Sequence, residues 1–132
     1  MDRGELKNFL DWTKLKLRIH FDKNIGVFFQ EREIWWASLG MNVGYEQNGK
    51  HETFERPILV LKKFNLNLMW IIPLTSVEKI GKYYYQTKHN DKISFFILSQ
   101  LRLVSAKRLR RKIRTLPWTE FRILRKKIKD LL

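Results

Sequence analysis

The chain has 132 residues, with 27 Lys and Arg against 13 Asp and Glu, which gives a formal net charge of +14. It has no cysteine, which excludes a disulfide scaffold, a thiolate-bound zinc site and a thiol nucleophile. Hydrophobic residues make up 44% of it, too many for a disordered basic tail, so we expect a single domain with its own core. The charge predicts an anionic partner, either nucleic acid, a membrane surface or an acidic protein.

The N-terminal part predicts an amphipathic helix over residues 5–19. Apolar or small side chains recur every three or four positions, with lysines and Arg18 outside this stripe. The stripe consists of Leu6, Phe9, Leu10, Thr13 and Leu17. Asn24-Ile25-Gly26 then breaks the helix. We therefore divide the chain into a helical extension, residues 1–32, and a main unit, residues 33–132.

The middle of the chain predicts short β-strands. Aromatic and aliphatic runs of strand length occur at 34–39, 58–61, 66–74, 82–87 and 92–98. A polar, glycine-containing loop separates the first two, from Gly40 to Glu55, and Arg56-Pro57 ends it. Pro73 predicts the point at which a strand ladder ends. Four or five such strands indicate a small, strongly curved antiparallel barrel.

The C-terminal third predicts short elements and a final helix. Ser105 is expected to cap a short helix at 106–109, and residues 111–116 are expected to form an edge segment. Thr119 is the expected N-cap of a helix that runs to Leu132. Its apolar stripe is predicted to comprise Phe121, Leu124, Ile128, Leu131 and Leu132. Residues 101–132 hold 12 Lys and Arg against two acidic residues, so most of the net charge lies there.

Known chemical signatures are few. The three histidines are far apart in the sequence, which argues against a metal site. There is no phosphate-binding glycine loop and no Gly-x-Ser-x-Gly elbow. No apolar run approaches the length of a membrane span and the N-terminus lacks a signal-peptide pattern, so we expect a soluble cytosolic protein without membrane attachment or cofactor.

Five short motifs follow one another in a fixed order along the chain. They are Ile34-Trp35-Trp36 with Leu39, Val43-Gly44-x-Glu46-Gln47-x-Gly49, Arg56-Pro57-Ile58-Leu59-Val60, Pro73-Leu74-Thr75-Ser76 and Leu98-Ser99-Gln100-Leu101-Arg102. In this order they resemble the MazF/PemK family of toxins from bacterial type II toxin–antitoxin pairs. The resemblance covers residues 33–131, including Val104-Ser105 and the C-terminal helix.

The resemblance implies a mainly β fold, a small SH3-like antiparallel β-barrel with a C-terminal helix, here with an extra N-terminal helix. It implies a homodimer, an acidic antitoxin and metal-independent cleavage of single-stranded RNA. Arg56 and Thr75 correspond to the catalytic pair of the family. The substrate-binding positions implied are Gly44, Glu46, Gln47, Gly49, Ser76 and Gln100.

This implied chemistry is physically reasonable. RNA is cut without metal when the ribose 2′-OH attacks its own phosphate, which requires proton transfer and stabilisation of the extra charge. A guanidinium matches phosphate oxygens as a planar fork, and a threonine hydroxyl donates a hydrogen bond to them. Trp36 and the tyrosines at 83–85 offer rings on which bases can stack.

Three features depart from the family pattern. Tyr45 stands where a small hydroxyl residue is common, residues 51–55 lengthen the link to Arg56, and residues 1–32 are an extension that most members lack. Two other functions remain open at this point. One is a gyrase-binding toxin like CcdB, which lacks the Arg-Pro and Thr pairing, and the other is a non-catalytic basic RNA-binding module.

Overall fold

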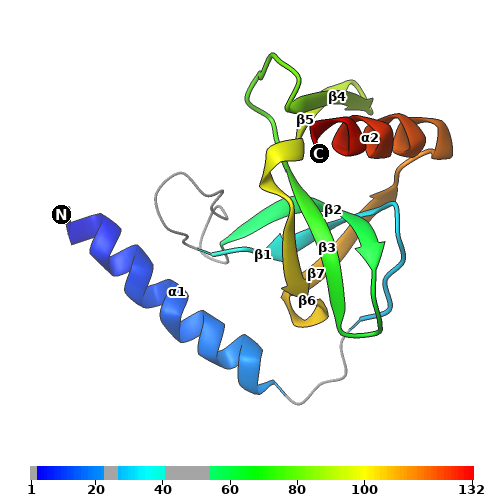
Figure 1. The fold of residues 1–132 in the computed structure, drawn as a ribbon. Coiled ribbons are helices and arrows are strands. Elements are labelled where there is room, and N and C mark those ends of the chain that lie inside the picture. Colours follow the sequence, from blue (N-terminus) through cyan, green and yellow to red (C-terminus); the bar gives the residue numbers. More distant parts are fainter. Residues whose placement is uncertain (1–2, 23–26, 41–53) are drawn as a thin grey trace.

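A computed structural model describes residues 3–22, 27–40 and 54–132 (Figure 1). Two α-helices flank seven β-strands, and 3-10 turns at Leu98–Gln100 and Ala106–Arg108 interrupt the later strands. No helix in these ranges is both long and apolar enough to cross a membrane. The elements are α1 (Arg3–Phe21), β1 (Glu33–Ser38), β2 (Glu55–Lys63), β3 (Leu68–Thr75), β4 (Tyr84–His89), β5 (Lys92–Ile97), β6 (Arg102–Ser105), β7 (Leu109–Thr115) and α2 (Trp118–Leu131).

The strands form a half-barrel, an antiparallel sheet in the order β4-β5-β3-β2-β1-β7, with β6 added beside β3. The expected curved antiparallel architecture is confirmed. The expected number of strands is too low, because β6 is only four residues long and lies between two 3-10 turns, so its sequence gives a weak strand signal. The expected edge segment is confirmed as β7, although it begins earlier, at Leu109.

Strand β2 differs from its expected limits in a way that matters for the site. Arg56 and Pro57 lie inside the strand rather than ending the loop, and they pair with Ala37 and Trp36 of β1. On its other edge β2 pairs with β3 up to Ile58 and Pro73. Beyond Pro73, strand β3 pairs with β5 instead, so the proline stands where one ladder gives way to another, as expected.

The sheet has an apolar cluster on each face. Even-numbered residues of β2, such as Ile58 and Val60, belong to one cluster together with Met69 and Ile71 of β3. The second cluster contains Leu59 and Ile72 and is covered by Phe121 and Leu124 of α2. Successive side chains on a strand point to opposite faces, which explains how adjacent residues enter different clusters.

Helix α2 confirms most of the expected stripe and corrects two details. Phe121 and Leu124 are fully buried and Ile128 and Leu131 pack against them, but Leu132 is fully exposed at the end of the helix. Thr119 is not the N-cap, since the helix begins at Trp118, two residues earlier than expected, and Pro117 takes the N-cap position without a side-chain hydrogen bond. At the shorter turn, Ser105 is confirmed as a cap and accepts a hydrogen bond from the Lys107 N–H at 3.2 Å.

Helix α1 confirms the expected helix, but its predicted apolar stripe is not the side that is buried. Its buried residue is Trp12, whose ring lies 5.6 Å from that of Phe54 and occupies the space where Gly40 would carry a Cβ. Gly40 has φ +77°, so a residue without a side chain satisfies both the backbone and the ring. The expected stripe instead faces solvent, with Leu6, Leu10 and Leu17 each about half exposed.

Candidate functional site

The candidate site centres on Arg56, a buried arginine at the start of β2. Only 5% of its surface is exposed, and its Nη1 donates a hydrogen bond of 3.1 Å to the carbonyl oxygen of Leu74. Burial lowers the pKa of the Arg56 guanidinium, because desolvation disfavours the charged form. Removing an arginine from water is costly, which makes this cation a candidate for function rather than solubility.

Thr75, the last residue of β3, is also buried. Its Oγ1 accepts a hydrogen bond of 3.2 Å from the Val77 N–H, which forms a local turn. An accepted bond uses a lone pair and does not consume the hydroxyl hydrogen. The turn therefore fixes the Oγ1 position while the hydroxyl keeps its capacity to donate.

Strand register brings Arg56 and Thr75 to the same end of β2 and β3. The β2–β3 ladder ends at the pairing of Ile58 with Pro73, and Arg56 and Thr75 each lie two residues beyond this pair. Both side chains then lie on the face that carries the Ile58 and Ile71 cluster. The contact from Arg56 to Leu74, the neighbour of Thr75, agrees with this placement. Sequence reasoning thus selected two residues, 19 positions apart, that the sheet brings to one end of one face.

Ser76 and Gln100 border this end of the sheet. Ser76 follows Thr75 directly and is exposed. Gln100 is half-buried at the end of the Leu98–Gln100 turn. This turn connects β5 and β6, which both pair with β3, so it passes alongside β3 between these two pairings. The predicted positions Gly44, Glu46, Gln47 and Gly49, like Tyr45, lie outside the described residues.

A second set of charged groups, which the sequence did not single out, surrounds the end of β1. Glu55 is buried next to Arg56 and pairs with Arg111 of β7, with an Nη2–Oε2 distance of 2.9 Å. Arg108 Nη1 donates to the Ser38 carbonyl at 3.1 Å, and Arg110 Nε donates to the Ser38 hydroxyl at 3.0 Å. These arginines form a basic rim that strand β1 separates from Arg56.

The basic rim is partly desolvated. Burial lowers the pKa of Arg108, and the nearby charge of Arg102 lowers it further. Two positive groups close together create a positive potential, which attracts anions. The available sequence signal was the run Arg108–Lys112, but only the pairing of β7 with β1 shows that it lies across β1 from the start of β2.

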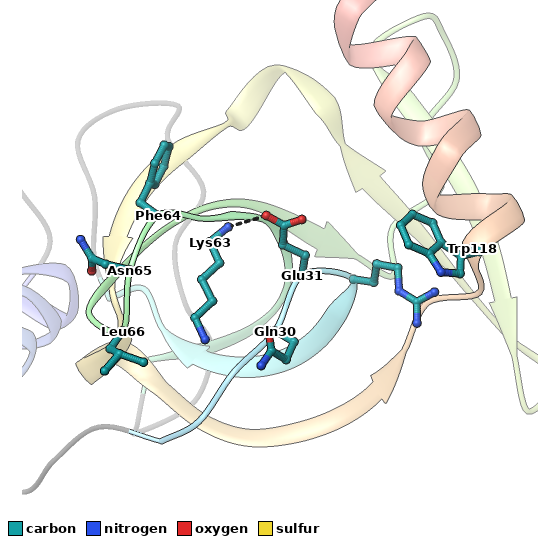
Figure 2. Close-up of a pocket in the computed structure, with 8 residues that line it drawn as sticks. Gln30, Glu31, Lys63, Phe64, Asn65, Leu66 and Trp118 are labelled. Atoms are coloured by element: carbon teal, nitrogen blue, oxygen red, sulfur yellow. Dashed lines mark hydrogen bonds between the residues drawn. The ribbon is translucent and has the colours of Figure 1, made fainter.

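A separate hollow of about 600 Å³ lies at the other end of β2 (Figure 2). Glu31, Lys63 and Trp118 are among its lining residues, and a Glu31 carboxylate oxygen accepts a 2.9 Å hydrogen bond from the Lys63 backbone N–H. The Arg32 guanidinium lies 4.6 Å from the Trp118 ring centre. The hollow includes neither Arg56 nor Thr75, so it is not the site that the motifs predicted.

The fold and site together define a small basic half-barrel protein with a buried arginine and a threonine at one end of its sheet. A family model described as the PemK-like, MazF-like toxin of type II toxin–antitoxin system matches residues 30–132. The chain therefore belongs to this family, and the expected resemblance is confirmed.

Solved structures agree on the fold. A MazF from Deinococcus radiodurans superposes with a TM-score of 0.62 at 19% identity, over 80% of this chain and 96% of that one. The Mycobacterium tuberculosis toxin MazF-mt6 gives a TM-score of 0.58 at 17% identity, over 75% of this chain and 94% of that one. A search of curated protein sequences finds no match.

Proposed function

We propose that the protein is an endoribonuclease toxin that cleaves single-stranded RNA without a metal ion, by attack of the ribose 2′-OH on the adjacent phosphate. Membership of the toxin family implies an antitoxin partner. The observation that carries the proposal is the buried Arg56 guanidinium, which is held against the carbonyl oxygen of Leu74, the residue before Thr75. A desolvated cation near a hydroxyl donor suits the charge that develops on a phosphorane.

Each residue has a distinct proposed role. The Arg56 guanidinium binds the non-bridging oxygens of the scissile phosphate, and its lowered pKa makes it a better proton donor than a solvated arginine. Thr75 donates its hydroxyl hydrogen to a phosphate oxygen. Ser76, Gln100 and the loop positions Gly44, Glu46, Gln47 and Gly49 contact the flanking nucleotides. The basic rim of Arg108, Arg110 and Arg111 gathers RNA by its charge. We further propose a homodimer as the working form.

The test is cleavage of single-stranded RNA in EDTA by the purified protein and by Arg56→Lys and Thr75→Val variants. We expect cleavage by the unmodified protein, products with cyclic phosphate ends, and rates lowered about a hundredfold or more in each variant. Both substitutions keep side-chain size close to the original, and circular dichroism checks that the variants fold. Arg122→Ala, at an exposed position of α2, serves as the matched control and should cleave normally.

The alternatives predict other results. Intact RNA in EDTA, or equal cleavage by all variants, would contradict the proposal. Tight binding of gyrase without RNA cleavage would favour a CcdB-like toxin. Salt-sensitive RNA binding without products would favour a plain RNA-binding module.

A further inference from the structure

Helix α1 carries apolar residues on two opposite sides. At 3.6 residues per turn, its inner side consists of Trp12, Leu15 and Ile19, and Trp12 is buried against Gly40 and Phe54. A second stripe lies about 180° round the helix. We call it the outer stripe, and it consists of Leu6, Leu10, Leu17 and Phe21, which are 47%, 55%, 53% and 70% exposed.

The anchoring of the inner side fixes which way the outer stripe points. The Arg108 guanidinium lies 5.7 Å from the Trp12 ring centre, and Lys107 Nζ donates a 2.8 Å hydrogen bond to the His20 carbonyl. These contacts hold both the middle and the end of α1 against the body. The outer stripe is therefore presented to solvent by a docked helix.

The spacing of the outer stripe indicates what kind of surface covers it. With Thr13 between Leu10 and Leu17, the positions from Leu6 to Phe21 follow one another at intervals of four, three, four and four residues. This is the narrow seam by which two helices pack along each other. A helical occupant therefore matches the stripe better than an extended strand.

The borders of the outer stripe indicate the charge of the occupant. Lys7, Lys14 and Arg18 follow one border and Lys16 the other, whereas Glu5 and Asp11 lie further round the helix. Lys7 also pairs with Asp11 at 3.3 Å on the exposed surface. Two copies of α1 packed along this seam would bring like charges together, whereas acidic borders on a partner would be attracted.

We propose that the outer stripe of α1 is a docking surface for an acidic amphipathic helix of the antitoxin. The inference rests on the proposed function, since the proposed occupant is the antitoxin that would inhibit this toxin. The family match begins at residue 30, so this surface lies outside the part that the family shares. It adds a contact to the partner that does not involve Arg56 or Thr75.

The test measures the affinity of the full-length toxin for the antitoxin encoded by the adjacent reading frame. Leu10→Lys with Leu17→Lys should weaken binding at least tenfold, because burial of one leucine is worth more than a factor of ten. Lysine is a good helix former, so α1 should keep its helicity. The matched control is Leu66→Lys with Ile93→Lys, which are also exposed apolar residues and should change the affinity less than twofold.

Further measurements separate this inference from its rivals. Lys14→Glu with Arg18→Glu should also weaken the complex, and by less at high salt, since screening weakens exposed charges. Unchanged antitoxin affinity in both double variants would overturn the inference. So would a toxin dimer that dissociates on Leu10→Lys with Leu17→Lys, or α1-dependent binding to vesicles containing anionic lipid.

Different experimental outcomes would contradict the docking surface and the proposed function. RNA cleavage without antitoxin measures the function alone, and the Leu10→Lys with Leu17→Lys variant should cleave at the normal rate. Cleavage that the antitoxin inhibits equally in the variant and in the unmodified toxin would overturn the docking surface and leave the function intact. Absence of cleavage in every form would contradict the function, while the affinity comparison would still decide the docking surface.

Discussion

The two helices of this protein have a similar sequence pattern, but the structure buries the apolar stripe of one helix and exposes that of the other. Both carry an apolar stripe bordered by lysines and arginines. Helix α2 buries Phe121 and Leu124 completely against the sheet. Helix α1 buries Trp12 and leaves Leu6, Leu10 and Leu17 facing solvent, and the helices lie on opposite sides of the half-barrel (Figure 1).

The difference shows that an apolar stripe does not by itself say what covers it. In α2 the stripe completes the cluster that includes Leu59, Ile72 and Phe96, so its burial contributes to folding. In α1 the buried ring of Trp12 lies on the attached side, and the stripe faces solvent, where we propose that another molecule covers it. The family match includes α2 and excludes α1. This agrees with a role for α2 in the core and an additional role for α1.

The largest expected contrast is in stability. Phe121→Ala should lower the free energy of unfolding by about 3–5 kcal/mol, because it removes a fully buried ring and leaves a cavity. Leu10→Ala should change it by less than about 0.5 kcal/mol, because the side chain is already exposed. Urea denaturation followed by circular dichroism measures both. Equal losses would mean that α1 belongs to the core and would remove the contrast.

A smaller and more local effect is expected where α1 attaches. Trp12→Ala should destabilise the docked helix by about 2–3 kcal/mol, since the indole fills the space over Gly40. Gly40→Ala should act in the same direction, because its Cβ would lie 1.8 Å from the Trp12 ring and its φ is +77°. Hydrogen exchange of the α1 amides should accelerate in both variants.

A control variant for the hydrogen-exchange measurement changes an exposed residue outside α1. Phe28→Ala changes a side chain that is 87% exposed and should leave α1 protected. If α1 keeps its protection in Trp12→Ala as well, another contact holds the helix and the proposed attachment is wrong.

The smallest expected effect is the pH dependence of stability at Glu33 of β1, in the sheet against which α2 packs. Burial by itself raises the pKa of Glu33, but hydrogen bonds from Lys112, the Gln30 N–H and the Trp35 indole outweigh it and hold the pKa below the ordinary 4.5. The folded state thus favours the charged carboxylate. Its stabilisation is present above about pH 4.5 and is lost as the pH falls through the lower, folded-state pKa.

Glu33→Gln should therefore cost about 1 kcal/mol at pH 7 and progressively less in acid. Denaturation midpoints at several pH values between 3 and 7 measure this effect, with Glu78→Gln, at an exposed position, as the control. A constant difference between Glu33→Gln and the unmodified protein across this range would contradict the assigned ion pair and hydrogen bonds.

Local patterns in the sequence were enough to predict much of the fold. The helix at 5–19, the strands near 34–39 and 92–98, the Ser105 cap and the role of Pro73 all depend on neighbouring residues, and the structure confirms them. The short strand β6 and the start of α2 were missed or misplaced, because their local signals are weak. Arg56 and Thr75 were selected by motif order, and the sheet register places them together.

The sequence by itself determined most of the elements, the family and the residues proposed to act on RNA, because periodicity, turn residues and motifs are read along the chain. Only the tertiary structure decided which apolar stripe is buried and which charges meet. The Glu55–Arg111 pair joins residues 56 positions apart, and the Trp12 ring meets Gly40, a residue from another part of the chain. Such contacts depend on how strands pair and helices dock, and the free energy of burial depends on that arrangement rather than on the pattern alone.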